Sequence, residues 1–218
     1  MEQGPQQKLE EFFSHFTKVK YEKGERILRE YDNPTGVFYI CKGVVRLYLI
    51  SEEGNELTAL LHSAQSILPL RWALGKQANI YNYQSMNGVE MYRAPRESFV
   101  KFLEENPECF MLVTQQLIQD SSALLYRMQH IVFGNAHSKV ASVVLTAAKR
   151  FSSQHEIDDA KHVIEVPLTH QQIADSAGIT RETASLEMKK LKEEGLISYK
   201  GRMLIVHDIE TLGKVSFL

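Results

Sequence analysis

The sequence predicts an α+β fold that begins with an antiparallel β-roll, continues into one long helix and ends in a domain of short helices with a β-hairpin. Three observations support this order. Short β-rich runs alternate with Gly, Asn and Asp turns over residues 19–99, helical periodicity fills residues 106–133, and two short helices precede two β-runs within residues 169–206. We therefore expect three regions, at residues 1–105, 106–134 and 135–218.

Composition places the chain among globular proteins with room for two ordinary domains. Its 218 residues are 44% hydrophobic and 24% charged, with a net charge of −2. The longest apolar runs, such as residues 143–145, are far shorter than the ~20 residues that span a bilayer. The N-terminus lacks the basic start and apolar stretch of a signal peptide. The sequence therefore predicts a cytoplasmic protein with no membrane partner.

The cysteines and histidines form no pattern typical of a metal site. Cys41 and Cys109 are far apart in the chain, so we expect packed thiols rather than a disulfide. His62 and His130 lack partners at ligand spacing, and no Cys-rich segment could hold an iron–sulfur cluster. We expect neither a metal nor another cofactor.

The first region combines a short helix with a series of strands. Leu9, Phe12, Phe13 and Phe16 follow helical spacing, which predicts an amphipathic helix over residues 7–16. The β-rich run over residues 43–50, the turn EEGNE and a second run over residues 57–61 predict a hairpin. Short strands at regular spacing favour a small antiparallel barrel or roll.

The long helix is expected to begin at Asn106-Pro107 and to end at a break or hinge at Gly134-Asn135. Along this helix, mostly apolar residues recur at alternating steps of four and three positions. This spacing places them in one seam along the helix, as a two-stranded coiled coil requires. The seam residues, which we expect at a homodimer interface, are Leu117, Ser121, Leu124, Met128 and Ile131. The alternative is a helix packed on its own domain through Leu112, Leu125 and Val132, and one helix can do both.

A further helix is predicted over residues 136–153, with Val140, Val143, Val144 and Ala147 on one side. A polar loop and a short β-run over residues 163–166 follow.

The most informative segment is THQQIADSAGITRETASLEMKKLKEEGLISYKGRMLIVH, which begins at Thr169. Thr169 is a good N-cap for a first helix. Ala174 leaves room for a second helix to approach, and Gly178 lies where a tight turn needs a left-handed backbone. Thr180 then caps a second helix. This pattern predicts a helix-turn-helix anchored by Ile173 and Ile179.

The second helix is expected to bury Ala184, Met188 and Leu191. Its opposite face presents residues that can read base edges in a major groove. Two strands around residues 200–202 then predict a wing with a basic tip near phosphates. The expected DNA contacts are Thr169, Gln171, Thr180, Arg181, Glu182, Ser185, Lys189, Lys200 and Arg202.

Together these features resemble the cyclic-AMP receptor protein/fumarate-nitrate regulator (Crp/Fnr) superfamily over essentially the whole chain. The most specific parts are the run TRET from Thr180, Gly178 and the segment from Gly195 to Gly201. The resemblance implies a cyclic-nucleotide-binding-like jelly roll, a dimerisation helix and a winged helix-turn-helix. It also implies a homodimeric transcription regulator on a palindromic DNA site, with half-sites ~34 Å apart, and RNA polymerase as a partner.

Two departures from the family limit what the resemblance implies. Leu186 occupies a position where many members have Arg, so the half-site sequence stays open. The residues at the cyclic nucleotide's phosphate and base positions are also replaced, by Leu68-Pro69, Asn79-Ile80 and Leu124-Leu125. We therefore expect an effector other than a cyclic nucleotide, or none.

Trp72, Tyr81, Tyr83 and Met86 form an aromatic cluster that could line a site for an apolar or aromatic ligand, or could simply fill the core. The expected effector pocket comprises Arg71, Trp72, Tyr81, Tyr83, Leu124 and Leu125.

Other function classes have less support. The sequence carries no nucleophile motif, Gly-rich phosphate loop or HExxH signature, so we expect no enzyme. A protein-interaction module, or an orphan dimer that no longer reads DNA, is the alternative. Leu186 and Glu187 favour that alternative, whereas Arg181 and the basic wing tip favour a DNA-binding regulator. The residues do not distinguish activation from repression.

Overall fold

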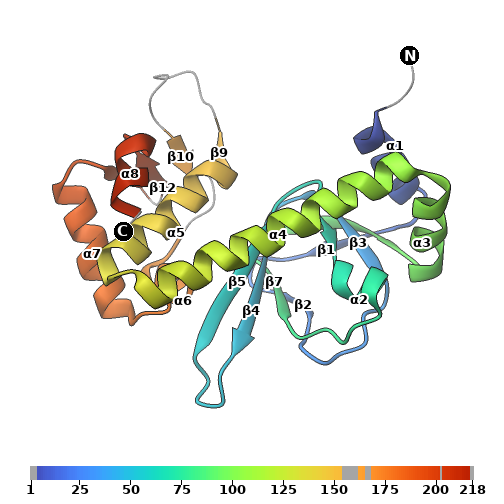
Figure 1. Cartoon of the computed structure of the whole chain (residues 1–218), viewed down its shortest axis with the longest axis horizontal. Helices are drawn as coiled ribbons and strands as arrows, with labels where there is room; N and C mark the ends of the chain where they lie inside the picture. Colours follow the sequence, from blue (N-terminus) through green and yellow to red (C-terminus); the bar gives the residue numbers. More distant parts are fainter. Residues whose placement is uncertain (1–3, 154–161, 165–167, 202, 217–218) are drawn as a thin grey trace. The chain divides into compact units, whose positions relative to one another are not determined.

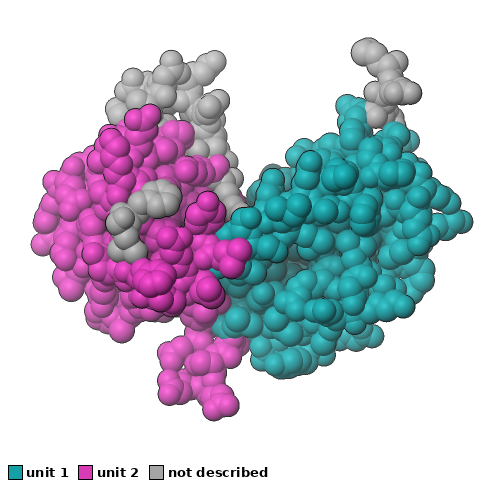
Figure 2. Space-filling model, in the orientation of Figure 1, with its two compact units in different colours: residues 1–49, 59–124 teal, residues 50–58, 125–218 magenta. Residues whose placement is uncertain are grey.

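The computed structural model describes residues 4–153, 162–164, 168–201 and 203–216 (Figure 1). The chain forms two compact units, coloured separately in Figure 2. The first comprises residues 1–49 and 59–124, and the second comprises residues 50–58 and 125–218.

Eight strands build the predicted roll. They form two four-stranded sheets with the orders β1-β8-β3-β6 and β2-β7-β4-β5. The expected hairpin is confirmed as the neighbouring pair β4 and β5. The strands are β1 (Thr17–Tyr21), β2 (Arg26–Leu28), β3 (Val37–Lys42), β4 (Val45–Ile50), β5 (Glu56–His62), β6 (Ile67–Leu68), β7 (Asn82–Ser85) and β8 (Val89–Ala94).

The roll is accompanied by three short helices, α1 (Pro5–Ser14), α2 (Leu70–Gly75) and α3 (Arg96–Glu105). The predicted opening helix is confirmed, because α1 buries Leu9 and Phe13. The Phe13 ring stacks on Tyr39 of β3, with ring centroids 5.2 Å apart. The sequence predicts no helix between the opening helix and α4, so α2, which interrupts the strands, and α3, which follows them, are additions to the predicted roll.

The long helix α4 (Pro107–Phe133) has the predicted bounds and is the yellow-green helix of Figure 1. Its first half is fixed to the roll by the side-chain amide of Gln116. This amide accepts a hydrogen bond from Ile67 N (3.0 Å) and donates one to Ile67 O (2.9 Å). These two bonds hold α4 beside β6.

The apolar faces of α4 match the expected arrangement only in part, because Met128 and Ile131 of the expected seam are exposed, at 61% and 39%, and other residues are not where they were expected. Leu117 and Leu124, assigned to the outward seam, are half-buried against the roll's core clusters. Leu125 and Val132, assigned to intramolecular packing, are exposed instead, at 63% and 62%. Successive helical residues lie about 100° apart, so a seam shifted by one residue faces a different direction. The exposed apolar stripe on α4 (hereafter the α4 stripe) comprises Met111, Ile118, Leu125, Met128 and Val132.

The second unit contains α5 (Ala136–Phe151), α6 (His170–Ala177), α7 (Arg181–Glu193) and α8 (Ile209–Ser216). Its sheet has the order β11-β12-β10-β9. Those strands are β9 (Ser152–Ser153), β10 (His162–Ile164), β11 (Ile197–Lys200) and β12 (Met203–Val206). The end of the predicted β-run over residues 163–166 lies outside the described residues. No helix in the described ranges is both long enough and apolar enough to cross a membrane.

The break between α4 and α5 falls at the predicted Gly134-Asn135. Asn135 Oδ1 accepts a hydrogen bond from Ser138 N at 2.9 Å, so Asn135 caps the start of α5. A Cβ on Gly134 would lie 2.6 Å from the carbonyl oxygen of His130. Gly134 is therefore required for space rather than for a left-handed backbone.

Candidate DNA-binding surface and ligand pocket

The helix-turn-helix is held by local capping. Thr169 Oγ1 accepts a hydrogen bond from Gln172 N (3.2 Å), and Gln172 Oε1 accepts one from Thr169 N (2.9 Å), which forms a capping box at the start of α6. The helix ends at Gly178, whose φ of 65° is the left-handed conformation that the sequence predicts. Ile173 and Ala174 are fully buried, so α6 presents its apolar face to the interior.

The next helix, α7, presents the predicted polar face at its N-terminal end. Thr180 Oγ1 caps the helix by accepting from Thr183 N at 3.2 Å. Arg181 and Glu182 are exposed on the first turn. The buried residues include the predicted Ala184, Met188 and Leu191. The free N-terminal turn of α7 can therefore approach another molecule without disturbing the core.

The other predicted contacts lie on α6, on α7 and in the wing. Gln171 is exposed, and its amide donates to Asp175 Oδ1 at 2.7 Å. Ser185 is half-buried, and Lys189 is exposed with its amine 3.7 Å from Glu193. Lys200 is exposed at the end of β11. Arg202 lies outside the described residues.

Leu186 is 62% exposed on α7, and the neighbouring Glu187 is only 7% exposed. Arg would hydrogen-bond to a guanine at the Leu186 position, whereas Leu can only make apolar contact, for example with a thymine methyl. Glu187 points away from this surface and into the second unit. Its charge therefore does not oppose DNA, and the expectation that it disfavours DNA binding has no structural basis.

The partners of Glu187 were not predicted. His137 Nδ1 lies 2.9 Å from Glu187 Oε2, and Lys190 Nζ donates to Glu187 Oε1 at 2.8 Å. Burial by itself would raise the pKa of the Glu187 carboxyl. The hydrogen bonds with Lys190 and His137 outweigh this effect, so the pKa of Glu187 lies below its ordinary value. The signal in the sequence is an acidic residue at a position that the spacing of Ala184, Met188 and Leu191 makes inward-facing.

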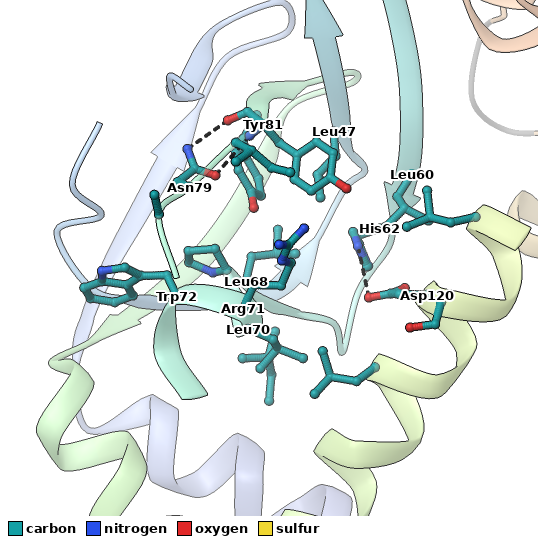
Figure 3. A pocket seen from close by; sticks show the side chains of 18 residues that line it. Leu47, Leu60, His62, Leu68, Leu70, Arg71, Trp72, Asn79, Tyr81 and Asp120 are labelled. Carbon is teal, nitrogen blue, oxygen red and sulfur yellow. Dashed lines mark hydrogen bonds and ion pairs between the residues drawn. The ribbon is translucent and has the colours of Figure 1, made fainter. Parts of the chain in front are cut away.

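The roll contains a cavity of about 310 Å³ (Figure 3). This volume lies at the lower end of the range for small-molecule sites, roughly 300–1,000 Å³. Of the six predicted effector residues, Arg71, Trp72, Tyr81, Tyr83 and Leu124 line the cavity. Leu125 does not, because it belongs to the exposed α4 stripe. The aromatic cluster in the sequence therefore predicted part of the cavity lining, and the role of these residues in binding an effector stays a prediction.

Asn79 and Pro69, at two of the positions that the resemblance assigns to nucleotide contacts, provide no cation for a cyclic phosphate. Asn79 is buried, and its amide donates to Arg29 O (2.6 Å) and Tyr81 O (2.8 Å), while its Oδ1 accepts from Tyr81 N (3.3 Å). Pro69, which also lines the cavity, has no N–H to donate. A phosphate needs several such donors or cations. This wall of the cavity therefore stabilises the chain itself.

The charged lining residues were only partly predicted. His62 Nε2 and Asp120 Oδ2 lie 3.6 Å apart, which is an ion-pair distance when His62 is protonated. Both residues come from elements distant in sequence, so spacing alone could not join them. Burial raises the pKa of the Tyr83 phenol, which keeps it protonated as a donor.

Both parts of the chain match known families. Residues 18–106 match the cyclic nucleotide-binding domain, and residues 138–215 match the Crp-like helix-turn-helix domain. A global nitrogen regulator of Nostoc sp. is 28% identical over 200 residues, covering 89% of this chain and 86% of that protein. The cAMP-activated global transcriptional regulator CRP of Salmonella typhimurium is 23% identical over 200 residues, covering 91% of this chain and 93% of CRP.

Solved structures show the same fold. FixK2 from Bradyrhizobium japonicum superposes with a TM-score of 0.77 at 18% identity, covering 93% of this chain and 98% of FixK2. A CooA mutant from Carboxydothermus hydrogenoformans superposes with a TM-score of 0.76 at 22% identity, covering 94% of this chain and 89% of CooA. The β-roll, long helix and helix-turn-helix are therefore a shared architecture.

Proposed function

This chain belongs to the Crp/Fnr superfamily of transcription regulators that carry a helix-turn-helix DNA-binding domain, and we propose that it binds a palindromic DNA site as a homodimer. We further propose that its roll responds to an effector other than a cyclic nucleotide. In this proposal residues 1–105 form the sensor, residues 106–134 the dimerisation helix and residues 135–218 the DNA-binding domain, with RNA polymerase as a further partner.

The observation that carries the DNA-binding proposal is the exposed first turn of α7. Arg181 and Glu182 lie there at the N-terminal end of a helix whose opposite face is buried. Arg can donate two hydrogen bonds to guanine, and Glu can accept one from cytosine N4. Lys189 and Lys200 add positive charge for phosphates on exposed positions nearby in sequence.

The homodimer proposal rests on the α4 stripe. Met111, Ile118, Leu125 and Val132 are spaced by seven residues, and all are exposed in the single chain. A seven-residue apolar repeat is the pattern that a second helix covers in a coiled coil. Two-fold symmetry of the dimer would then require a DNA site with two-fold symmetry.

Binding-site selection from random duplex DNA tests this function. We expect the full-length protein, at a stated salt concentration, to enrich a palindrome whose half-sites are one helical turn apart, ~34 Å. Selection is repeated with each ligand that the cavity binds, because an effector can be needed for high affinity. Enrichment of an asymmetric motif would contradict the dimer, and failure to enrich any motif under all conditions would favour an interaction module.

A further inference from the structure

We propose that the cavity of the roll binds a small organic monoanion, namely a carboxylate on an apolar body, and that Arg71 recognises the carboxylate. Only the role of this ligand as the effector rests on the proposed function. Binding itself is a property of the roll and is measured without DNA.

The lining of the cavity favours an apolar body. Leucine and isoleucine side chains line much of the cavity, together with the aromatic residues Trp72, Tyr81 and Tyr83. Sites of this kind bind small organic molecules through buried apolar area, and a few polar groups set the orientation. A large polar ligand such as a nucleotide would leave many of its own hydrogen-bonding groups unsatisfied here.

The charges of the lining favour one negative charge on the ligand. Arg71 is the one side chain with a permanent positive charge among the described lining residues. His62 is charged only when it is protonated, and its Nε2 then faces Asp120 Oδ2 at 3.6 Å. Arg71 donates to the neutral Gln77 Oε1 at 2.8 Å, and no acidic side chain in the described ranges forms an ion pair with it. The Arg71 charge is therefore available to an anion.

The position of Arg71 suits it to bind the carboxylate of the ligand. It lies on α2 at an exposed position, and Figure 3 shows its side chain among those that surround the cavity. A guanidinium binds a carboxylate through two parallel hydrogen bonds. The single charge of Arg71 can balance one carboxylate, whereas a dianion such as a phosphate monoester would leave a second negative charge uncompensated in a lining that also contains Asp120.

The chain provides its own reporter of binding. Trp72 is the only tryptophan, and it lines the cavity beside Arg71. Its fluorescence can therefore be followed while full-length protein is titrated with four probes. Octanoate and 4-phenylbutyrate carry the carboxylate on two different apolar bodies, and octanamide and 4-phenylbutanamide are their uncharged counterparts. Calorimetry on the same samples gives the dissociation constants independently of fluorescence.

We expect at least one carboxylate to bind about tenfold or more tightly than its amide, because a hydrogen-bonded charge contributes that much. Arg71→Gln is expected to remove this preference. Lys76→Gln is the matched control, because Lys76 is an exposed cation just after α2 that does not line the cavity.

Equal binding of acids and amides in wild type would overturn the proposal and indicate an uncharged ligand. Failure of both acids to bind at millimolar concentration would also overturn it. An unchanged acid preference in Arg71→Gln would contradict the role of Arg71. Because no DNA is present, each result leaves the DNA-binding proposal to its own test.

Discussion

His137 Nδ1 lies 2.9 Å from Oε2 of the buried Glu187, which joins the first turn of α5 to α7. The other ring nitrogen, Nε2, lies 3.4 Å from Glu194 Oε2 at the end of α7. One imidazole therefore contacts two carboxylates of the helix that we propose reads DNA. His137 follows the break at Gly134-Asn135, so this contact connects the break directly to α7.

Removing the imidazole should destabilise the second unit. In His137→Ala the buried carboxylate of Glu187 keeps Lys190 but loses its second partner, so we expect the free energy of unfolding to fall by about 1–3 kcal/mol. Urea unfolding measures the change. His15→Ala, at an exposed position of the first unit, should change it by less than about 0.5 kcal/mol. A double-mutant cycle with Glu187→Gln isolates the pair, and a coupling energy near zero would show that the contact does not stabilise the fold.

Glu187 should also make stability depend on acidity. Its pKa is lower in the folded chain than in the unfolded chain, so the unfolded chain takes up the proton first as pH falls. The stabilisation is therefore present above about pH 4.3, the ordinary Glu pKa, and is lost as pH falls through the folded-state pKa. Unfolding measured across this window should show a weaker loss of stability in Glu187→Gln than in wild type. Equal slopes for the two proteins would contradict the lowered pKa.

The α4 stripe should control oligomeric state without affecting the fold of one chain. Replacing both Ile118 and Leu125 with Glu places two like charges per chain in the proposed interface, so sedimentation should shift from dimer to monomer. Circular dichroism should remain that of the wild type, because both side chains are exposed. Gln129→Glu, at an exposed polar position of α4, is the control and should stay dimeric. A dimer that persists in the double variant would place the interface elsewhere.

Gly134 and Gly213 should respond to alanine with opposite signs. A Cβ at Gly134 would lie 2.6 Å from a backbone oxygen, which cannot move as a flexible side chain could, so Gly134→Ala should lower stability by about 1–3 kcal/mol. A Cβ at Gly213, inside α8, meets nothing within 4 Å, so Gly213→Ala should raise stability by up to about 1 kcal/mol. Denaturant unfolding of the two variants checks both signs. A stabilising Gly134→Ala would show that the break is not sterically constrained.

The elements that the sequence predicts correctly depend on local signals. The bounds of α4 follow from Pro107 and Gly134, and the helix-turn-helix follows from the caps at Thr169 and Thr180 and the left-handed Gly178. These features depend on neighbours within one or two turns. The same is true of α3, whose buried Phe99 and Leu103 have helical spacing, although the predicted roll did not include this helix.

Features that depend on tertiary packing were not predicted. Leu124 and Leu125 are adjacent and chemically identical, and only the position of the roll decides which one is buried. His62 and Asp120 meet because β5 and α4 border one cavity, and His137 and Glu187 meet because α5 packs on α7. The sequence shows that Asn79 replaces the Arg that would bind a cyclic nucleotide. Only the structure shows that the Asn79 amide donates hydrogen bonds to Arg29 O and Tyr81 O.

The most direct measurement of the central proposal is the affinity of wild type, Arg181→Ala and Lys214→Ala for the selected site. Each protein is also titrated on duplexes that carry every single-base change in one half-site. Arg181→Ala should lose about 1–3 kcal/mol and become indifferent to the base at one position per half-site. Lys214→Ala, which removes an exposed charge on α8, should keep both the affinity and the base preferences of wild type. If Arg181→Ala binds every duplex as wild type does, the first turn of α7 does not read DNA.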